Sequence, residues 1–90
     1  MIDFKDFKIG QYIKLSASKA GENGILTAYS LHAKDNVWFG KIINVNPGLD
    51  LWYQAMPRMT ARYYIMYSDA TEYYLKIEIV DEMQARLLCE

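Results

Sequence analysis

The chain has 90 residues, which limits it to one domain. Ten Lys and Arg residues against eleven Asp and Glu residues give a net charge of -1, and this balance excludes DNA binding that is driven by charge alone. Hydrophobic residues make up 52% of the chain, so it is not a disordered tail. One Cys and one His exclude a disulfide framework and a metal site of Cys and His alone, and we expect neither a metal nor a cofactor.

Neither membrane insertion nor export is predicted. The chain has no run of 18 apolar residues, and residues 1–8 lack the basic start and apolar stretch of a signal peptide. Cys89 is the penultimate residue, whereas a prenylation signal needs Cys four residues from the end. We therefore expect a cytoplasmic protein with no membrane contact.

Turn signals divide the chain at short intervals, and the segments between them have the composition of strands. Asn23-Gly24 is the strongest two-residue hairpin signal, and Asn46-Pro47-Gly48 and residues 68–71 predict further turns. The strands expected between these turns are residues 11–17, 25–31, 37–45, 49–56, 61–67 and 72–80.

Both ends of the chain show short helical patterns. Residues 3–8 predict one helical turn, and residues 81–90 predict a helix. Asp81 is in position to cap that helix, with Gln84 three residues later. The apolar face expected for the helix consists of Val80, Met83, Leu87 and Leu88.

Strands joined by short loops predict an antiparallel meander. Six such strands can curl into a small barrel or a strongly bent sheet, with the terminal helix closing one end. The expected fold is therefore mainly β: residues 1–90 form a single small domain, a six-stranded antiparallel meander with a short C-terminal helix.

A hairpin with Asp69 and Ala70 at its tip would pair residues 61–67 with residues 72–80. Its better core face carries Tyr64, Met66, Tyr73, Leu75, Ile77 and Ile79. The opposite face carries Tyr63, Ile65, Tyr67 and Tyr74. An aromatic cluster with charged neighbours is typical of a binding surface. The same pairs could instead only stabilise the sheet, or lie under the helix.

A second hairpin, around Asn46-Pro47-Gly48, would place Val45 opposite Leu49. Its expected core face carries Phe39, Lys41, Ile43, Leu51, Tyr53 and Ala55. Trp38 and Trp52 share the other face, with Trp52 over Gly40. Each Trp carries around 200 Å² of surface, which favours burial; if exposed, the two are the best anchors for a partner.

Three segments together resemble the Tudor-like and SH3-like small barrels. They are Phe7-Lys8-Ile9-Gly10-Gln11-Tyr12-Ile13-Lys14-Leu15, then Trp38-Phe39-Gly40-Lys41-Ile42-Ile43, and finally Tyr64-Ile65-Met66-Tyr67-Ser68-Asp69 followed by Glu72. The resemblance implies a binding module. In methyl-ligand Tudor domains, aromatic rings and an acid hold a methylated cation, and the matching positions here are Trp38, Phe39, Tyr67 and Asp69. The hairpin strand at 25–31 and the insert at 49–60 depart from the minimal pattern of these barrels.

Candidate catalytic groups are few, and we expect no enzyme activity. His32 lies beside a turn, where a solvated loop side chain is the ordinary case. The chain contains no Gly-x-Ser-x-Gly nucleophile motif and no Gly-rich phosphate loop. Nothing in the sequence places Cys89 beside His32.

The charge is unevenly distributed along the chain. Residues 1–48 carry six Lys against four acids, and residues 49–90 carry four basic residues against seven acids. Small barrels bind single-stranded nucleic acid with mixed Lys and aromatic faces. The residues that would make such a face are Lys14, Lys19, Lys34 and Lys41.

The sequence favours a small binding protein that occupies a site on another protein. The expected anchors are Tyr63, Ile65, Tyr67, Tyr74, Trp38 and Trp52. By analogy, small Tyr-rich chains without catalytic groups are typical of phage or mobile-element inhibitors of host machinery. The alternatives are a nucleic-acid-binding module and a self-associating subunit, such as a homodimer joined through one of the aromatic faces.

Overall fold

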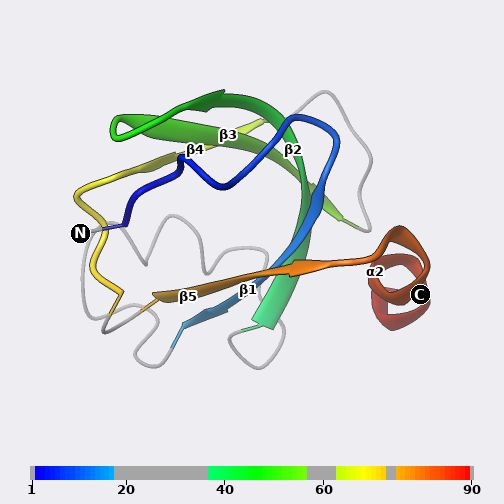
Figure 1. Ribbon diagram of the computed structural model, residues 1–90. Helices are drawn as coiled ribbons and strands as arrows, with labels where there is room; N and C mark the ends of the chain where they lie inside the picture. The colour runs from blue at the N-terminus through cyan, green and yellow to red at the C-terminus, as the bar shows by residue number, and fades with distance from the viewer. Residues whose placement is uncertain (1, 18–36, 57–62, 73–74, 90) are drawn as a thin grey trace.

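The computed structural model describes residues 2–17, 37–56, 63–72 and 75–89. These residues form one bent antiparallel sheet (Figure 1). A short helix follows the last strand. The elements are β1 (Tyr12–Ala17), β2 (Val37–Asn46), β3 (Asp50–Met56), β4 (Tyr64–Tyr67), β5 (Leu75–Val80) and α2 (Glu82–Cys89). The mainly β class and the short C-terminal helix are confirmed.

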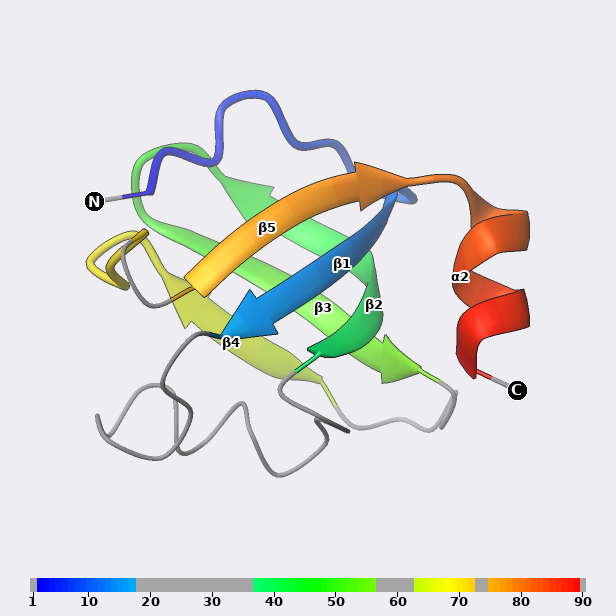
Figure 2. The same ribbon diagram turned by 90° about the horizontal axis from the view of Figure 1, so that it is seen from below.

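The strand order is β4-β3-β2-β1-β5, with every neighbouring pair antiparallel. Strands β2, β3 and β4 follow one another as in the predicted meander. β1 pairs directly with β2, where the meander predicted a strand at 25–31 between them, and β5 returns to pair with β1 (Figure 2). The sheet is open, with β4 and β5 at its two edges. Of the two predicted forms, a small barrel or a strongly bent sheet, the barrel is therefore wrong. The described residues contain five strands, and the predicted strand at residues 25–31 lies outside them.

The predicted hairpin between residues 61–67 and 72–80 is also wrong, because β4 and β5 lie at opposite edges of the sheet. After β4 the chain forms a turn in which the Ala70 N–H donates to the Tyr67 carbonyl at 3.0 Å. Ala70 is 1% exposed and belongs to the core. β5 then pairs with β1 at the far edge of the sheet instead of folding back on β4.

The main core lies on the inner face of the sheet. Its most deeply buried side chains include Phe4, Ile13, Leu15, Ile42, Leu51, Tyr53, Met66 and Leu75. Phe4 belongs to a single turn at the N-terminus, closed by the Phe7 N–H donating to the Phe4 carbonyl at 3.1 Å. The short turn replaces the predicted helical turn and brings Phe4 into the core. Trp38 also lies in this core, where its Nε1–H donates to the Tyr53 hydroxyl at 3.1 Å.

The β2–β3 hairpin forms where predicted, but its register differs. Near the turn Val45 pairs with Leu51, and after an irregularity around residue 43 Ile42 pairs with Tyr53. An extra residue in one strand exchanges the inner and outer positions beyond it. Ile42 and Trp38 are therefore in the main core, in the places predicted for Ile43 and Phe39.

The same shift in register changes which ring covers Gly40. A Cβ atom added at Gly40 would lie 2.6 Å from Cδ2 of Tyr53, a distance that real Cβ atoms do not show. Tyr53, and not Trp52 as predicted, is therefore the ring that packs on this glycine.

Helix α2 begins as predicted, with the Gln84 N–H donating to Asp81 Oδ1 at 2.8 Å. Its buried residue is Ala85, which packs in a second cluster with Tyr12, Phe39 and Met56 on the outer face of the sheet. The predicted apolar face is wrong at Met83, which is 72% exposed, and at Leu87, which is 67% exposed. Val80 of that face does pack against the second cluster, and the side chain of Leu88 is not described. A small residue at the contact lets the helix approach the sheet closely, and this turns the larger side chains outward.

Candidate functional site

Four of the six predicted anchors lie together on the outer side of β3 and β4, although through a different pairing from the one expected. Trp52 of β3 lies directly opposite Ile65 of β4, and side chains in such a cross-strand pair lie on the same face. Tyr67 is two residues beyond Ile65, and Tyr63 is two residues before it, so both continue that face. We call these four residues, Trp52, Tyr63, Ile65 and Tyr67, the Trp52 surface.

The Trp52 surface combines half-buried side chains with exposed ones. Trp52 and Ile65 are half-buried, and the rings of Tyr63 and Tyr67 are each 52% exposed. The inward side chains of the same strands, such as Met66, are in the core. The surface is therefore an aromatic layer on a packed sheet.

Polar residues border this surface on the β2 side. Asn44 lies opposite Trp52, and Asp50 lies opposite Tyr67. Asn46 and Asp50 form a side-chain hydrogen bond across the base of the hairpin. These groups give the surface a polar rim with a single negative charge.

Ser68 holds the end of β4 against the β2–β3 turn. Its hydroxyl donates to the Gly48 carbonyl at 2.8 Å, and its N–H donates to the Leu49 carbonyl at 2.8 Å. Its own carbonyl accepts the Ile2 N–H at 3.0 Å. Gly48 has φ 74°, which favours glycine at this turn. These bonds fix the backbone on which Tyr67 is carried.

Of the other two predicted anchors, one is in the core and one lies outside the described residues. Trp38 is 3% exposed in the main core, so its ring is not accessible to a partner. Tyr74 lies outside the described residues, as does its predicted neighbour Tyr73. Among the remaining members of the predicted core face, Leu75 and Ile77 pack in the core, but Ile79 is 51% exposed.

The aromatic cage implied by the resemblance to Tudor-like domains does not form. Trp38 packs in the main core on the inner face, and Phe39 packs under α2 on the outer face. Neighbouring residues of a strand point to opposite faces, so these two rings cannot enclose one ligand. Tyr67 and Asp69 lie at the end of β4, at the opposite edge from β5.

The predicted Lys face is represented by two side chains in the described part of the chain. Lys14 lies between Phe39 on β2 and Glu78 on β5, so an acid is its cross-strand neighbour. Lys41 Nζ lies 5.7 Å from the centroid of the Tyr12 ring. Lys19 and Lys34 lie outside the described residues.

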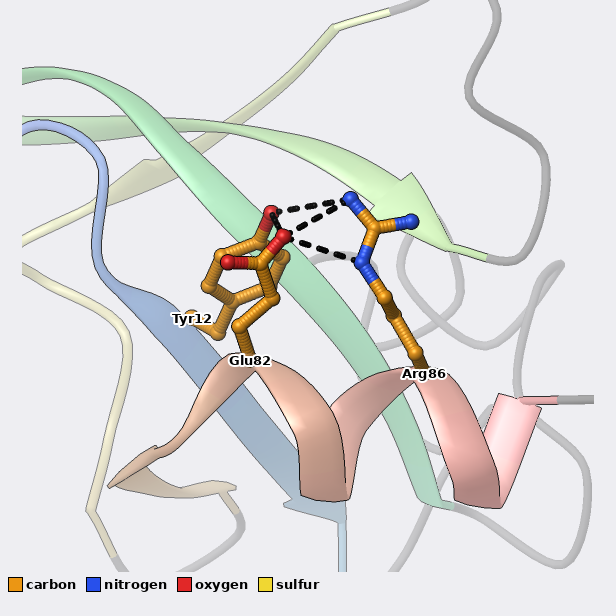
Figure 3. Close-up of polar contacts among 3 residues, drawn as sticks. All are labelled: Tyr12, Glu82 and Arg86. Carbon is orange, nitrogen blue, oxygen red and sulfur yellow. Dashed lines mark hydrogen bonds and ion pairs between the residues drawn. The ribbon is translucent and has the colours of Figure 1, made fainter.

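A polar cluster that the sequence interpretation missed joins α2 to β1 (Figure 3). The Tyr12 hydroxyl donates to Glu82 Oε1 at 3.1 Å, and Arg86 Nε donates to the same oxygen at 3.0 Å. A second guanidinium nitrogen of Arg86 lies 2.9 Å from that oxygen and 3.4 Å from the Tyr12 hydroxyl. The spacing of Glu82 and Arg86, four residues apart, was the available sequence signal.

These contacts change the acidity of both charged groups. The Arg86 guanidinium and the Tyr12 hydroxyl hold the pKa of Glu82 below its ordinary value of 4.5. The Glu82 carboxylate in turn raises the pKa of Arg86. Both groups are solvent-exposed and already paired, so the cluster fastens the helix to the sheet and does not present a reactive group.

The described residues offer little else for chemistry. An open groove of about 360 Å³ lies between the N-terminal segment and β5, and its lining includes Asp3, Phe7 and Lys76. The described ranges hold no group of three His, Cys, Asp or Glu side chains that could bind a metal ion. In the same ranges, no helix has the length and apolar character needed to cross a membrane.

Comparison of the chain with protein-family models, curated proteins and solved structures returned no match. The resemblance to Tudor-like and SH3-like barrels therefore remains a prediction.

Proposed function

We propose that this protein is a small non-enzymatic binding protein that occupies a site on another protein with its Trp52 surface. The observation that carries the proposal is the cross-strand pair of Trp52 and Ile65, flanked by two half-exposed Tyr rings. Trp and Tyr are the residues most enriched at the energetic centres of protein interfaces.

The degree of burial of these side chains supports the proposal. A half-buried Trp52 on a hydrogen-bonded strand has lost much of its freedom already, so little entropy remains to be lost when a partner covers it. The Tyr63 and Tyr67 rings supply apolar area and a hydroxyl each, with few rotatable bonds. A partner would gain contact area without having to reorder the sheet.

The polar rim supports a defined orientation for the partner. Asp50, beside Tyr67, is a charged group next to the surface, and Asn44 offers both a donor and an acceptor beside Trp52. A partner with a basic or donor group facing Asp50 would satisfy the rim. Rim charges of this kind set the rate of association and the orientation more than the affinity.

The mechanism is occupancy. A domain that covers a partner's functional site blocks it without chemistry of its own, which fits the phage-type or mobile-element inhibitors of host machinery that the sequence suggests by analogy. Such an inhibitor needs a rigid aromatic surface and a polar rim, and it needs no catalytic group.

The proposal is tested with two double variants, each of which replaces two exposed hydrophobic side chains with Ser. Tyr63→Ser/Tyr67→Ser removes two half-exposed rings from the Trp52 surface, and Met83→Ser/Leu87→Ser removes two exposed apolar side chains from α2. Each variant is first checked for folding by circular dichroism. Wild type and both variants are then immobilised and exposed to lysate of the source cell, with and without nuclease.

We expect a protein partner that resists nuclease, is retained by wild type and by the α2 variant, and is lost by the Tyr63→Ser/Tyr67→Ser variant. Retention by both variants would refute the assignment to the Trp52 surface. Recovery of nucleic acid alone, with a steep loss of binding as salt increases, would replace the proposal with the nucleic-acid alternative.

A further inference from the structure

The β5 strand leaves one of its two sides unpaired in the described part of the chain. The Ile42 N–H donates to the Gln11 carbonyl at 2.8 Å, so the odd-numbered residues of β1 bond to β2. Antiparallel pairs alternate between bonded and non-bonded positions, so the even-numbered residues of β1 bond to β5. Their partners are the even-numbered residues of β5. The backbone N–H and C=O groups of Ile77 and Ile79 consequently point away from the sheet.

The described edge carries no Pro, no bulge and no inward-pointing charge, which are three of the features that prevent strands from pairing. Outward charges are a further such feature, and Lys76 and Glu78 therefore favour pairing only in a register that matches their signs. The inward side chains of β5 are Leu75, Ile77 and Ile79, and the residues on its outer face include Lys76 and Glu78. Ile79 is 51% exposed although it is on the inner face, where its neighbours Leu75 and Ile77 pack in the core.

We infer that this edge is a docking site for a second copy of the chain, which adds its own β5 in antiparallel orientation about a two-fold axis at Ile77. Such pairing would place Ile77 opposite Ile77 of the second copy, which is a bonded position because the backbone groups of this residue point outward. Lys76 would lie opposite Glu78 of the second copy, and Glu78 opposite Lys76. The two sheets would form one continuous sheet.

Charge complementarity selects this register and this occupant. A shift of the axis to Lys76 would place Lys76 opposite itself, and a shift to Glu78 would place Glu78 opposite itself. Like charges directly opposite each other destabilise a strand pair. In the monomer Lys76 Nζ already lies 3.1 Å from Glu78 Oε1, so the two charged groups extend to the same height above the outer face. The charge pattern of the strand therefore complements itself in the register centred on Ile77.

The inner face provides a place for the exposed Ile79. In the selected register Ile79 of the second copy lies opposite Leu75, which lines the groove between β5 and the N-terminal segment with Ile77, Ile2 and Phe7. The groove of about 360 Å³ has room for an aliphatic side chain. A side chain that is half-exposed in the monomer would thus be covered in the dimer.

The experiment is sedimentation over a concentration series from about 1 μM to about 1 mM. Few residues meet at such an edge, so we expect a dimer that dissociates on dilution, with the mass increasing from 10.5 kDa towards twice that value. The charge reversals Lys76→Glu and Glu78→Lys should each weaken self-association by about tenfold or more, because they place like charges across the edge.

Two further measurements separate charge matching from damage to the fold. An equimolar mixture of the Lys76→Glu and Glu78→Lys variants should associate, since one edge then carries two acids and the other two bases. The double variant Lys76→Glu/Glu78→Lys should associate like wild type. The variant Tyr63→Ser/Tyr67→Ser should also associate like wild type, because the Trp52 surface is not involved.

A wild type that stays at 10.5 kDa throughout the series would overturn the inference. The inference would also be overturned if the single charge-reversal variants associated as strongly as wild type. Failure of the equimolar mixture of the two variants to associate would overturn it too. Loss of association in Tyr63→Ser/Tyr67→Ser would reject β5 in favour of the Trp52 surface. A monomeric wild type would leave the proposed function unaffected, since binding through the Trp52 surface does not require the dimer.

Discussion

The outer face of the sheet has two halves that differ in what covers them. On one half, Tyr12, Phe39 and Met56 lie beneath Ala85 of α2 and are each 7% exposed or less. On the other half, the Trp52 surface has no helix from the described residues over it, and its Tyr rings remain 52% exposed. Both halves are aromatic, and β3 contributes to each through Met56 and Trp52. Aromatic content therefore does not decide burial; the position of the helix does.

The attachment of α2 explains why only one half is covered. The helix is held by Ala85 at the centre and by the Tyr12–Glu82–Arg86 cluster at one side. The polar cluster involves β1, and Ala85 packs on side chains of β1, β2 and the end of β3. A helix of eight residues is about 12 Å long. Such a helix covers two or three strands at their spacing of about 4.8 Å, and β4 lies beyond its reach.

The largest effect on the free energy of unfolding is expected when an aromatic ring is removed from the covered half. Phe39→Ala should reduce the free energy of unfolding by about 3–5 kcal/mol, because it removes a buried ring and leaves a cavity between α2 and the sheet. The measurement is urea denaturation followed by circular dichroism. A loss of less than about 1 kcal/mol would show that the second cluster contributes little to stability.

A smaller effect is expected from crowding the contact between helix and sheet. Ala85→Leu should cost about 1–3 kcal/mol, because Ala85 is fully buried and the larger side chain forces α2 away from Tyr12 and Phe39. The matched control is Met83→Leu, which changes an exposed side chain on the same helix and should leave the free energy of unfolding nearly unchanged. Equal effects of the two substitutions would contradict the described packing of the helix.

A weaker effect is expected from acid. The pKa of Glu82 is lower in the folded protein than its ordinary value of 4.5, so its contribution is complete above pH 4.5 and is lost as the pH falls through the lowered value. Because the side chains are exposed, the effect should be small and should decrease with salt. We expect the protection of the α2 amides against hydrogen exchange, measured by NMR relative to the intrinsic exchange rate at each pH, to decrease in acid. In Glu82→Gln this part of the pH dependence should disappear, and its persistence would assign it to another carboxyl group.

The smallest effect on stability is expected on the open half. Tyr67→Ser should change the free energy of unfolding by only about 0.5 kcal/mol, because half of the ring is already in water and its strand is held by Ser68. Thermal denaturation measures this directly, beside Phe39→Ala. A cost comparable to that of Phe39→Ala would mean that the Trp52 surface is part of the core, and it would remove the basis of the proposed function.

Local sequence patterns were sufficient to predict the position of most strands and turns of the sheet. All five described strands begin and end within three residues of their predicted bounds, and the turn at Asn46-Pro47-Gly48 and the Asp81 cap are confirmed. Turn chemistry and capping depend on residues a few positions apart, which a sequence displays directly. The outward placement of Tyr63, Ile65 and Tyr67 follows from alternation within a single strand in the same way.

The candidate surface was only partly predictable, because it depends on which strands are neighbours. Tyr63, Ile65 and Tyr67 were assigned to one face, but their predicted neighbour was Tyr74, and the described neighbour is Trp52. The Trp pair was expected on one face, and the irregularity around residue 43 separates Trp38 from Trp52. A single extra residue has no strong sequence signal, yet it exchanges every side chain beyond it between the two faces.

The sequence by itself determined the β class, the approximate strand positions and the alternation within each strand, since these depend on local sterics and on the burial of every second residue. The tertiary structure alone decided that β5 pairs with β1, that Trp38 is core while Trp52 is at the surface, and that α2 covers one half of the outer face. These outcomes depend on contacts between residues far apart in the chain, such as Ala70 in the core and Ala85 on the sheet. Many pairings satisfy the local pattern equally well, and the packing of the whole chain selects among them.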